Sequence, residues 1–367
     1  MRRCCPGSTK KGRHGWLAAA TLWLAGLASA TWCAPLRAAE RLPGGGLPAA
    51  GDAALFPPPP LPLAREPAAH QLWLVSTRRL PHGPHATVAL DFTVALDFEV
   101  QRYEQATGWS DASLDELLAA DDPRLVTSVL VHGNHTNRQW AITKGLGVYR
   151  TLVASAQAEQ PVRLIVWSWP SDQVPGSFRE DARVKAQRTN IEGYYLARFL
   201  DRLRGPNPVS LVGYSFGARV ITGALHLLGG GELEGRRLGE REQFPRPPLH
   251  ALLMAAAIDR DWLLPGRPHG RALSSVERMV IFVNPQDRVL RWYRFVSPGE
   301  ALGSHGLPSR LDADRANLVE IDVGTAVGNR HGWTNYIGSP AIVKYLQRET
   351  LVETMRQTGS RSQAGGG

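Results

Sequence analysis

Cysteine is nearly absent from this sequence. The 367 residues include three cysteines, at positions 4, 5 and 33, and none follows residue 33. A chain body without cysteine excludes an internal disulfide framework, a thiolate nucleophile and a metal site with cysteine ligands. An enzyme built from this sequence must therefore use another nucleophile.

Acidic residues are absent from the first 39 positions, which carry six basic residues. An apolar run from Trp16 to Ala30 closes on the small residues Ala28-Ser29-Ala30. This arrangement predicts a secretory signal peptide over residues 1–39. The run of 15 residues is shorter than the roughly 20 that span a bilayer, so we expect an exported protein, periplasmic or secreted after cleavage. The alternative is a leader that stays uncleaved and anchors the protein in a membrane.

A large surplus of charge of either sign is also missing. The formal net charge is +9, but the chain beyond the leader holds 36 basic and 33 acidic residues. A nucleic-acid-binding domain is usually much more basic, so we expect no nucleic-acid partner. No feature predicts a protein partner, and membrane association is expected only through an uncleaved leader.

Proline, glycine and alanine dominate residues 40–70, which include Pro57-Pro58-Pro59-Pro60. This composition favours an extended linker over a packed element. A single globular domain is predicted over residues 71–350, and the tail at 351–367 is expected to be disordered.

Hydrophobic periodicity predicts an α/β domain. Residues 71–76 predict a strand, and residues 87–98 (TVALDFTVALDF) place their large apolar side chains at one parity, which is typical of a strand with one buried face. Near-continuous apolar runs predict strands buried on both faces at 125–131, 162–168, 208–213, 249–258, 278–283 and 317–323. Helical spacing is found at 137–156, 177–204, 216–228 and 338–350. We therefore expect a mainly parallel central sheet flanked by helices, with an N-terminal strand or hairpin extension.

The residues that indicate chemistry begin with Gly213-Tyr214-Ser215-Phe216-Gly217, a G-x-S-x-G sequence between a predicted strand and a predicted helix. A turn this sharp holds the serine in a strained backbone conformation and requires glycine at Gly213 and Gly217. The serine hydroxyl is lifted above the sheet. The N–H of Phe216 lies at the helix start, where an oxyanion is stabilised. Ser215 is therefore the predicted nucleophile.

This sequence resembles the α/β-hydrolase superfamily over residues 71–350, and within it a branch of exported bacterial hydrolases with few characterised members. The resemblance implies the chain order nucleophile, acid, histidine. It implies the acid after the second strand beyond the serine, at Asp287, and the histidine after the last strand, at His331. Asp259, one strand earlier, is the alternative acid, and His305 is the alternative histidine.

The resemblance also implies a second oxyanion donor after the apolar run 125–131, where the sequence continues His132-Gly133-Asn134-His135. The backbone N–H of Asn134 is the predicted donor. His132 and His135 could alternatively be metal ligands, but the sequence has no cysteine or obvious third ligand near them. We expect neither a metal nor a cofactor.

Tryptophan is plentiful, with 11 residues. Four are predicted to form an aromatic wall of a substrate pocket at the carboxyl edge of the sheet: Trp169, Trp262, Trp292 and Trp333. The alternative is that they pack loops over the sheet. The glycine-rich, charged segment 229–248 is predicted to be an exposed loop, too polar for a lipase lid.

Together these residues predict a serine hydrolase that cleaves an ester-type bond in a small molecule through an acyl-enzyme on Ser215. His331 would act as general base and acid, oriented by Asp287. Amidase, thioesterase or peptidase activity would use the same residues. The alternative from another class is a non-catalytic exported binding protein with the same fold.

Overall fold

The computed structural model describes residues 70–82, 96–122, 124–156, 160–239, 245–308 and 317–352. All of them belong to one compact unit, Ala64–Gly367. The predicted leader, the linker up to residue 69, residues 87–95 of the predicted second strand and the tail from residue 353 lie outside the described residues. Within the described ranges, no helix is both long enough and apolar enough to cross a membrane.

The strands form one nine-stranded sheet in the order β3-β2-β1-β5-β4-β6-β7-β8-β9. β2 pairs antiparallel with β1 and with β3, and every other neighbouring pair is parallel. The strands are β1 (Gln71–Ser76), β2 (Glu99–Glu104), β3 (Gly108–Ala112), β4 (Val126–Val131), β5 (Val162–Ser168), β6 (Val209–Tyr214), β7 (Leu249–Met254), β8 (Arg278–Val283) and β9 (Leu318–Asp322). The parallel strands therefore bring the loops that follow them to one edge of the sheet.

The α-helices are α1 (Leu114–Ala119), α2 (Arg138–Ser155), α3 (Phe178–Leu200), α4 (Phe216–Leu228), α5 (Leu302–His305), α6 (Gly324–Val327), α7 (Trp333–Ile337) and α8 (Pro340–Gln347). Two short 3-10 helices, η3 (Ala272–Ser274) and η4 (Leu290–Phe295), and a π-helix, η6 (Arg348–Val352), complete the described helical segments. Side-chain caps define where the long helices begin. Asn137 accepts the N–H of Trp140 at the start of α2, and Ser177 accepts the N–H of Glu180 at the start of α3.

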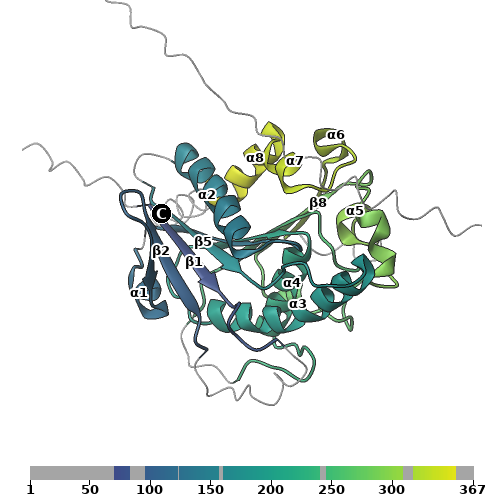
Figure 1. The fold of residues 1–367 in the computed structure, drawn as a ribbon, viewed down its shortest axis with the longest axis horizontal. Coiled ribbons are helices and arrows are strands. Elements are labelled where there is room, and N and C mark those ends of the chain that lie inside the picture. Colours follow the sequence, from purple (N-terminus) through teal and green to yellow (C-terminus); the bar gives the residue numbers. More distant parts are fainter. Residues whose placement is uncertain are drawn as a thin grey trace, which may run out of the picture. The chain divides into compact units, whose positions relative to one another are not determined.

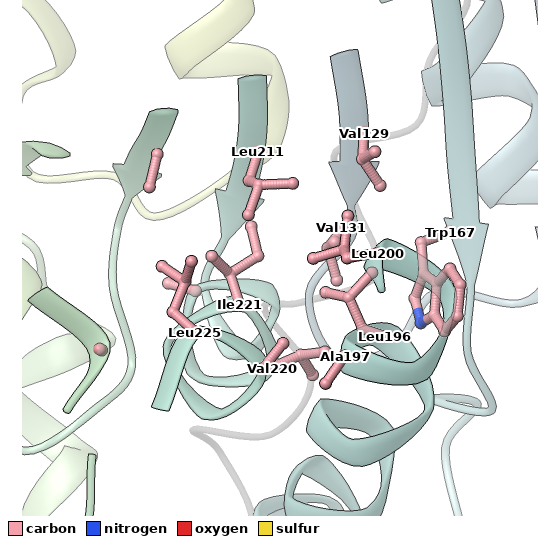
Figure 2. Packing of buried hydrophobic residues seen from close by; sticks show 14 of the residues in the cluster. Val129, Val131, Trp167, Leu196, Ala197, Leu200, Leu211, Val220, Ile221 and Leu225 are labelled. Atoms are coloured by element: carbon pink, nitrogen blue, oxygen red, sulfur yellow. The ribbon is translucent and has the colours of Figure 1, made fainter. Parts of the chain in front are cut away.

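Helices cover both faces of the sheet. In Figure 1, α2, α7 and α8 lie on one side and α3 and α4 on the other. Each face has its own buried apolar cluster, one with α3 and α4 and one with α2, α7 and α8. Figure 2 shows the first cluster, in which α3 and α4 pack their apolar side chains against β4, β5 and β6. The observed architecture confirms the predicted mainly parallel sheet flanked by helices.

The structure confirms the N-terminal strand and a hairpin extension, but the hairpin lies elsewhere in the sequence than predicted. The strand predicted at 87–98 is not a strand at residues 96–98, and its other residues from 87 lie outside the described ranges. The observed hairpin is formed instead by β2 and β3. Apart from the buried Val100, the side chains of these two strands are partly buried or exposed, and the hairpin lies at one edge of the sheet. These strands therefore lack the apolar runs that reveal the central strands.

Two further predictions change in detail. The strand predicted at 249–258 ends at Met254, because Ala255 takes the left-handed backbone angle φ 48° and turns the chain away from the sheet. The residues beyond stay buried, which explains why they resemble a strand in sequence. The prediction of an exposed loop at 229–248 is wrong for Leu233 and Arg236, which are buried and exchange backbone hydrogen bonds.

Candidate active site

Ser215 lies at the junction of β6 and α4. Its backbone angles are φ 55° and ψ −120°, a left-handed conformation that is costly for a residue with a Cβ. Two hydrogen bonds from the neighbouring strand and its loop hold this conformation. The N–H of Ser215 donates to the carbonyl of Met254 (2.9 Å), and the carbonyl of Ser215 accepts the N–H of Ala257 (3.2 Å).

The two glycines of the turn are required by close contacts. A Cβ on Gly213 would lie 2.8 Å from the Cα of Ala218 in the first turn of α4. A Cβ on Gly217 would lie 2.1 Å from the carbonyl oxygen of Val131 at the end of β4. Gly213 thus lets the helix fold back onto its own strand, and Gly217 lets it approach the neighbouring strand.

His331 lies between Ser215 and Asp287. Its Nε2 is 3.1 Å from Ser215 Oγ, and its Nδ1 is 2.8 Å from Asp287 Oδ2. The Asp287 side chain is fully buried, and that of His331 is 13% exposed. When Nδ1–H donates to the carboxylate, the lone pair of Nε2 faces the serine hydroxyl and can accept its proton.

The loops that carry the acid and the histidine are tied to each other. Asp287 Oδ1 accepts the N–H groups of Val289 (2.9 Å) and Leu290 (3.0 Å), which leaves Oδ2 for the histidine. Asn284, just after β8, donates its side-chain N–H to the carbonyl of Gly328 in the histidine loop (2.9 Å). The carboxylate therefore has a defined orientation toward the imidazole.

The two alternative triad residues have other partners. Asp259 is buried and accepts a hydrogen bond from the Ser297 hydroxyl (2.5 Å). His305 bonds through Nδ1 to the Ser304 hydroxyl (2.8 Å), and its Nε2 faces Glu300 (3.6 Å). Within the described ranges neither is hydrogen-bonded to Ser215 or His331.

The loop after β4 approaches the serine closely. A Cβ on Gly133 would lie 2.9 Å from Ser215 Cβ, so only glycine lets the backbone come this near. In the described part of the chain, the backbone N–H groups of Phe216 and Asn134 have no hydrogen-bond acceptor. Phe216 is the first residue of α4, where helix geometry leaves the N–H unpaired. The structure thus brings two unpaired donors to the loops beside Ser215.

The histidines of this loop form hydrogen bonds that do not fit a metal site. His132 is buried, and burial lowers its pKa well below the usual value. Its Nδ1 donates to the carbonyl of Gly133 (3.0 Å), and its Nε2 accepts the N–H of Trp169 (3.3 Å). His135 pairs with Asp181. Among the residues that the structure describes, no group of three or more His, Cys, Asp or Glu side chains could hold a metal ion.

Comparison with protein families decides the classification. The model of the alpha/beta hydrolase family matches residues 129–354, more than half of the chain. This chain belongs to the alpha/beta hydrolase family. Among solved structures, an acetylxylan esterase determined at 0.90 Å resolution matches with a TM-score of 0.30 and 10% identity, over 61% of this chain and 98% of its own. That similarity is too low to indicate a substrate, and comparison with curated proteins finds no match.

In this hydrolase the loop after β4 is held by a buried aspartate that sequence analysis missed. Asp181, in the first turn of α3, accepts the side-chain N–H of Asn134 (3.1 Å) and lies 2.8 Å from His135 Nε2. Its other oxygen accepts from Lys185 Nζ (2.7 Å) and from the N–H of Val174 (2.8 Å). Burial raises the pKa of Asp181, but these hydrogen bonds, led by that of Lys185, outweigh it and lower the pKa to about 2. The carboxylate thus connects the loop to α3.

The four tryptophans predicted as a pocket wall have different environments. Trp169 is fully buried, stacks on His132 and donates to its carbonyl (2.7 Å), so it supports the loop from beneath instead of lining a pocket. Trp262 is partly buried beneath the Arg219 guanidinium at 4.2 Å. Trp333 packs edge-on against the ring of Tyr214. Trp292 is 56% exposed. In this hydrolase the four tryptophans therefore do not form a single wall of a pocket.

Proposed function

We propose that this hydrolase is a serine esterase in which Ser215 is the nucleophile, His331 the general base and acid, and Asp287 the orienting acid. One observation carries the proposal: a single imidazole is hydrogen-bonded on one nitrogen to the serine hydroxyl and on the other to a buried carboxylate. A hydroxyl is a weak nucleophile until a base accepts its proton, and this arrangement supplies the base in the required tautomer.

In the first half of the reaction, Ser215 Oγ attacks the carbonyl carbon of the ester while His331 Nε2 takes the hydroxyl proton. The carbonyl double bond becomes a single bond, and its oxygen becomes an oxyanion. The N–H groups of Phe216 and Asn134 are proposed to stabilise that oxyanion, aided by the positive end of α4. When the carbonyl re-forms, the ester C–O bond breaks, and the leaving alcohol takes its proton from His331.

In the second half, a water molecule gives a proton to His331 and attacks the acyl carbon attached to Ser215. The oxyanion forms again between the same two donors. Its collapse releases the carboxylic acid and returns the proton to Ser215 Oγ. The Asp287 carboxylate stabilises the imidazolium that forms twice per cycle.

An ester is the proposed substrate, in preference to an amide, because an alkoxide is a far better leaving group than an amide anion, so an ester depends less on protonation of the leaving group by His331. Neither a metal nor a cofactor takes part in the proposed steps. Two observations support the proposal that the site stabilises an oxyanion: the two unpaired N–H groups, and the buried Asp181 that holds the loop carrying one of them.

The test is labelling of the purified full-length protein by a fluorophosphonate, together with hydrolysis of a short p-nitrophenyl ester. Wild type should be labelled once, and Ser215→Ala should lose both labelling and turnover. Ser297→Ala, which removes a buried serine hydrogen-bonded to Asp259, is the matched control and should keep both. A folded wild-type protein that reacts with no fluorophosphonate would overturn the proposal.

A further inference from the structure

The short helix η4 presents three different edges. A 3-10 helix has three residues per turn, so side chains at i and i+3 are aligned along one edge. Leu290 and Tyr293 form the buried edge of η4. Trp292 and Phe295 form a second edge, and Arg291 and Arg294 form a third; all four of these side chains are exposed.

The aromatic edge is unusual on this surface. Trp292 is 56% exposed and Phe295 is 38% exposed. The two rings stack with centroids 5.4 Å apart and an angle of 25° between their planes. Trp292 and Phe295 therefore lie together on the described surface. Exposed apolar side chains are more commonly scattered singly.

The cationic edge extends beyond the helix. Arg288 precedes η4 by two positions and continues the three-residue spacing of Arg291 and Arg294. The Arg294 guanidinium lies 5.4 Å from the centroid of the Phe295 ring, so charge and aromatic surface are adjacent. Among the described residues, no acidic side chain forms an ion pair with any of these three arginines. We call Arg288, Arg291, Trp292, Arg294 and Phe295 the η4 patch.

The η4 patch lies directly beside the proposed catalytic residues. Asp287 immediately precedes it and accepts the N–H of Leu290, the first residue of η4. The N–H of Arg288 donates to the carbonyl of Asn329 (3.3 Å), two residues before His331. A surface bound to the patch would therefore lie next to the loops that carry the acid and the histidine.

We propose that the η4 patch docks onto the headgroup region of an anionic lipid bilayer. Exposed arginines are attracted to anionic headgroups, while tryptophan and phenylalanine insert at the boundary between headgroups and acyl chains. A soluble polyanion would satisfy the arginines but would leave the stacked rings without an apolar environment, and for this reason the lipid surface is the better fit. This route to a membrane differs from the alternative of an uncleaved leader and does not depend on the proposed esterase activity.

The experiment uses the full-length protein and vesicles of phosphatidylcholine, with and without phosphatidylglycerol. Arg288→Gln, Arg291→Gln and Arg294→Gln are combined in one variant. Its partitioning onto the anionic vesicles should be at least about tenfold weaker than that of wild type. The matched control replaces Arg150, Arg179 and Arg183, three exposed arginines elsewhere, and should bind as wild type does.

A second measurement reports on the patch itself, whether or not the leader also inserts. Brominated phosphatidylglycerol in the vesicles quenches tryptophans that reach the acyl chains. Trp292→Phe should remove part of the quenchable fluorescence of wild type, whereas Trp140→Phe, at a tryptophan that is 44% exposed outside the patch, should not.

Three results would overturn the proposal. The first is equal partitioning of wild type and the triple arginine variant. The second is equal quenching in wild type and Trp292→Phe. The third is binding to soluble dextran sulfate that matches vesicle binding and is unaffected by Trp292→Ala with Phe295→Ala, because that pattern indicates attraction to any polyanion. Circular dichroism of every variant shows whether it is folded.

Discussion

Asp287 and Asp259 follow neighbouring strands of the sheet, and both are buried. Asp287 divides its oxygens between His331 and two backbone N–H groups, whereas Asp259 bonds to Ser297. Both residues are aspartates, and each lies a few positions in the sequence after the end of a strand. Their hydrogen-bond partners alone distinguish an acid that can orient the histidine from one that stabilises the structure.

The two aspartates should respond differently to the same substitution. Asp287→Asn keeps the shape but favours the wrong histidine tautomer, so kcat for ester hydrolysis should fall by about 10³–10⁴-fold. Asp259→Asn should lower the melting temperature and change kcat of the folded enzyme by less than about tenfold, since it acts through packing. Equal losses of kcat in the two variants would contradict the assignment of the acid.

At the scale of elements, the loop after β4 joins the sheet to α2 and lies against the serine. Gly133 provides the close approach, and Asp181 of α3 holds the side chains of Asn134 and His135. His135 itself has the left-handed backbone angle φ 51°, a strained value for a residue with a Cβ. The loop therefore depends on a helix that begins some 40 residues later in the chain.

Substituting Gly133 should disable this loop. The new Cβ in Gly133→Ala would lie 2.9 Å from Ser215 Cβ and 3.0 Å from the carbonyl oxygen of Tyr214, so the loop must move away from the serine. Loss of one oxyanion donor costs about 10²–10³-fold in kcat. Gly147→Ala in α2, where a Cβ meets nothing within 4 Å, is the control and should keep full activity. Comparable kcat values for the two variants would show that the loop is not needed.

Asp181→Asn should change how stability depends on pH. The folded-state pKa of Asp181 is about 2, below the usual 3.8, so the carboxylate stabilises the fold above about pH 4. That contribution, about 2 kcal/mol, is lost as the pH falls from about 4 to about 2. The variant should be less stable than wild type at neutral pH by about that amount, and this difference should shrink in acid. Urea unfolding across this range measures it, and a pH-independent difference would contradict the account.

At the scale of the whole molecule, the parallel sheet determines where the site lies. β4, β6 and β8 each end at the same edge, and the loops that follow them carry Asn134, Ser215 and Asp287. His331 follows β9, which is the neighbour of β8. Residues that are far apart in sequence therefore meet at the edge where open α/β sheets form their binding sites.

The unit Ala64–Gly367 contains the whole described sheet, both apolar clusters and every proposed catalytic residue. A chain limited to this unit is therefore expected to unfold in one cooperative transition and to keep fluorophosphonate labelling. Thermal unfolding followed by circular dichroism, with labelling as the second readout, tests this. Loss of labelling in a folded shortened chain would show that residues before Ala64 contribute to the site.

Local features of this protein could be predicted from its sequence because their causes are local. The strands β1, β5 and β8 have the predicted bounds, since a strand buried on both faces must be a continuous apolar run. The turn at Ser215 could be recognised for a similar reason, because its two glycines and its strand and helix are adjacent in the chain. The hairpin of β2 and β3 escaped prediction because an edge hairpin with exposed side chains has no comparable pattern.

The sequence by itself determined the α/β class, the long helices and the strained serine turn, and its resemblance to a known family narrowed the partners of Ser215 to Asp287 or Asp259 and to His331 or His305. Only the tertiary structure decided which aspartate bonds to the histidine, that Asp181 holds the loop after β4, and that Trp169 is buried beneath it. The physical reason is that backbone conformation follows from neighbours in the chain. A hydrogen bond between two side chains that are distant in sequence depends on how their strands and helices pack. The order of the strands in the sheet cannot be inferred from any single segment of the sequence.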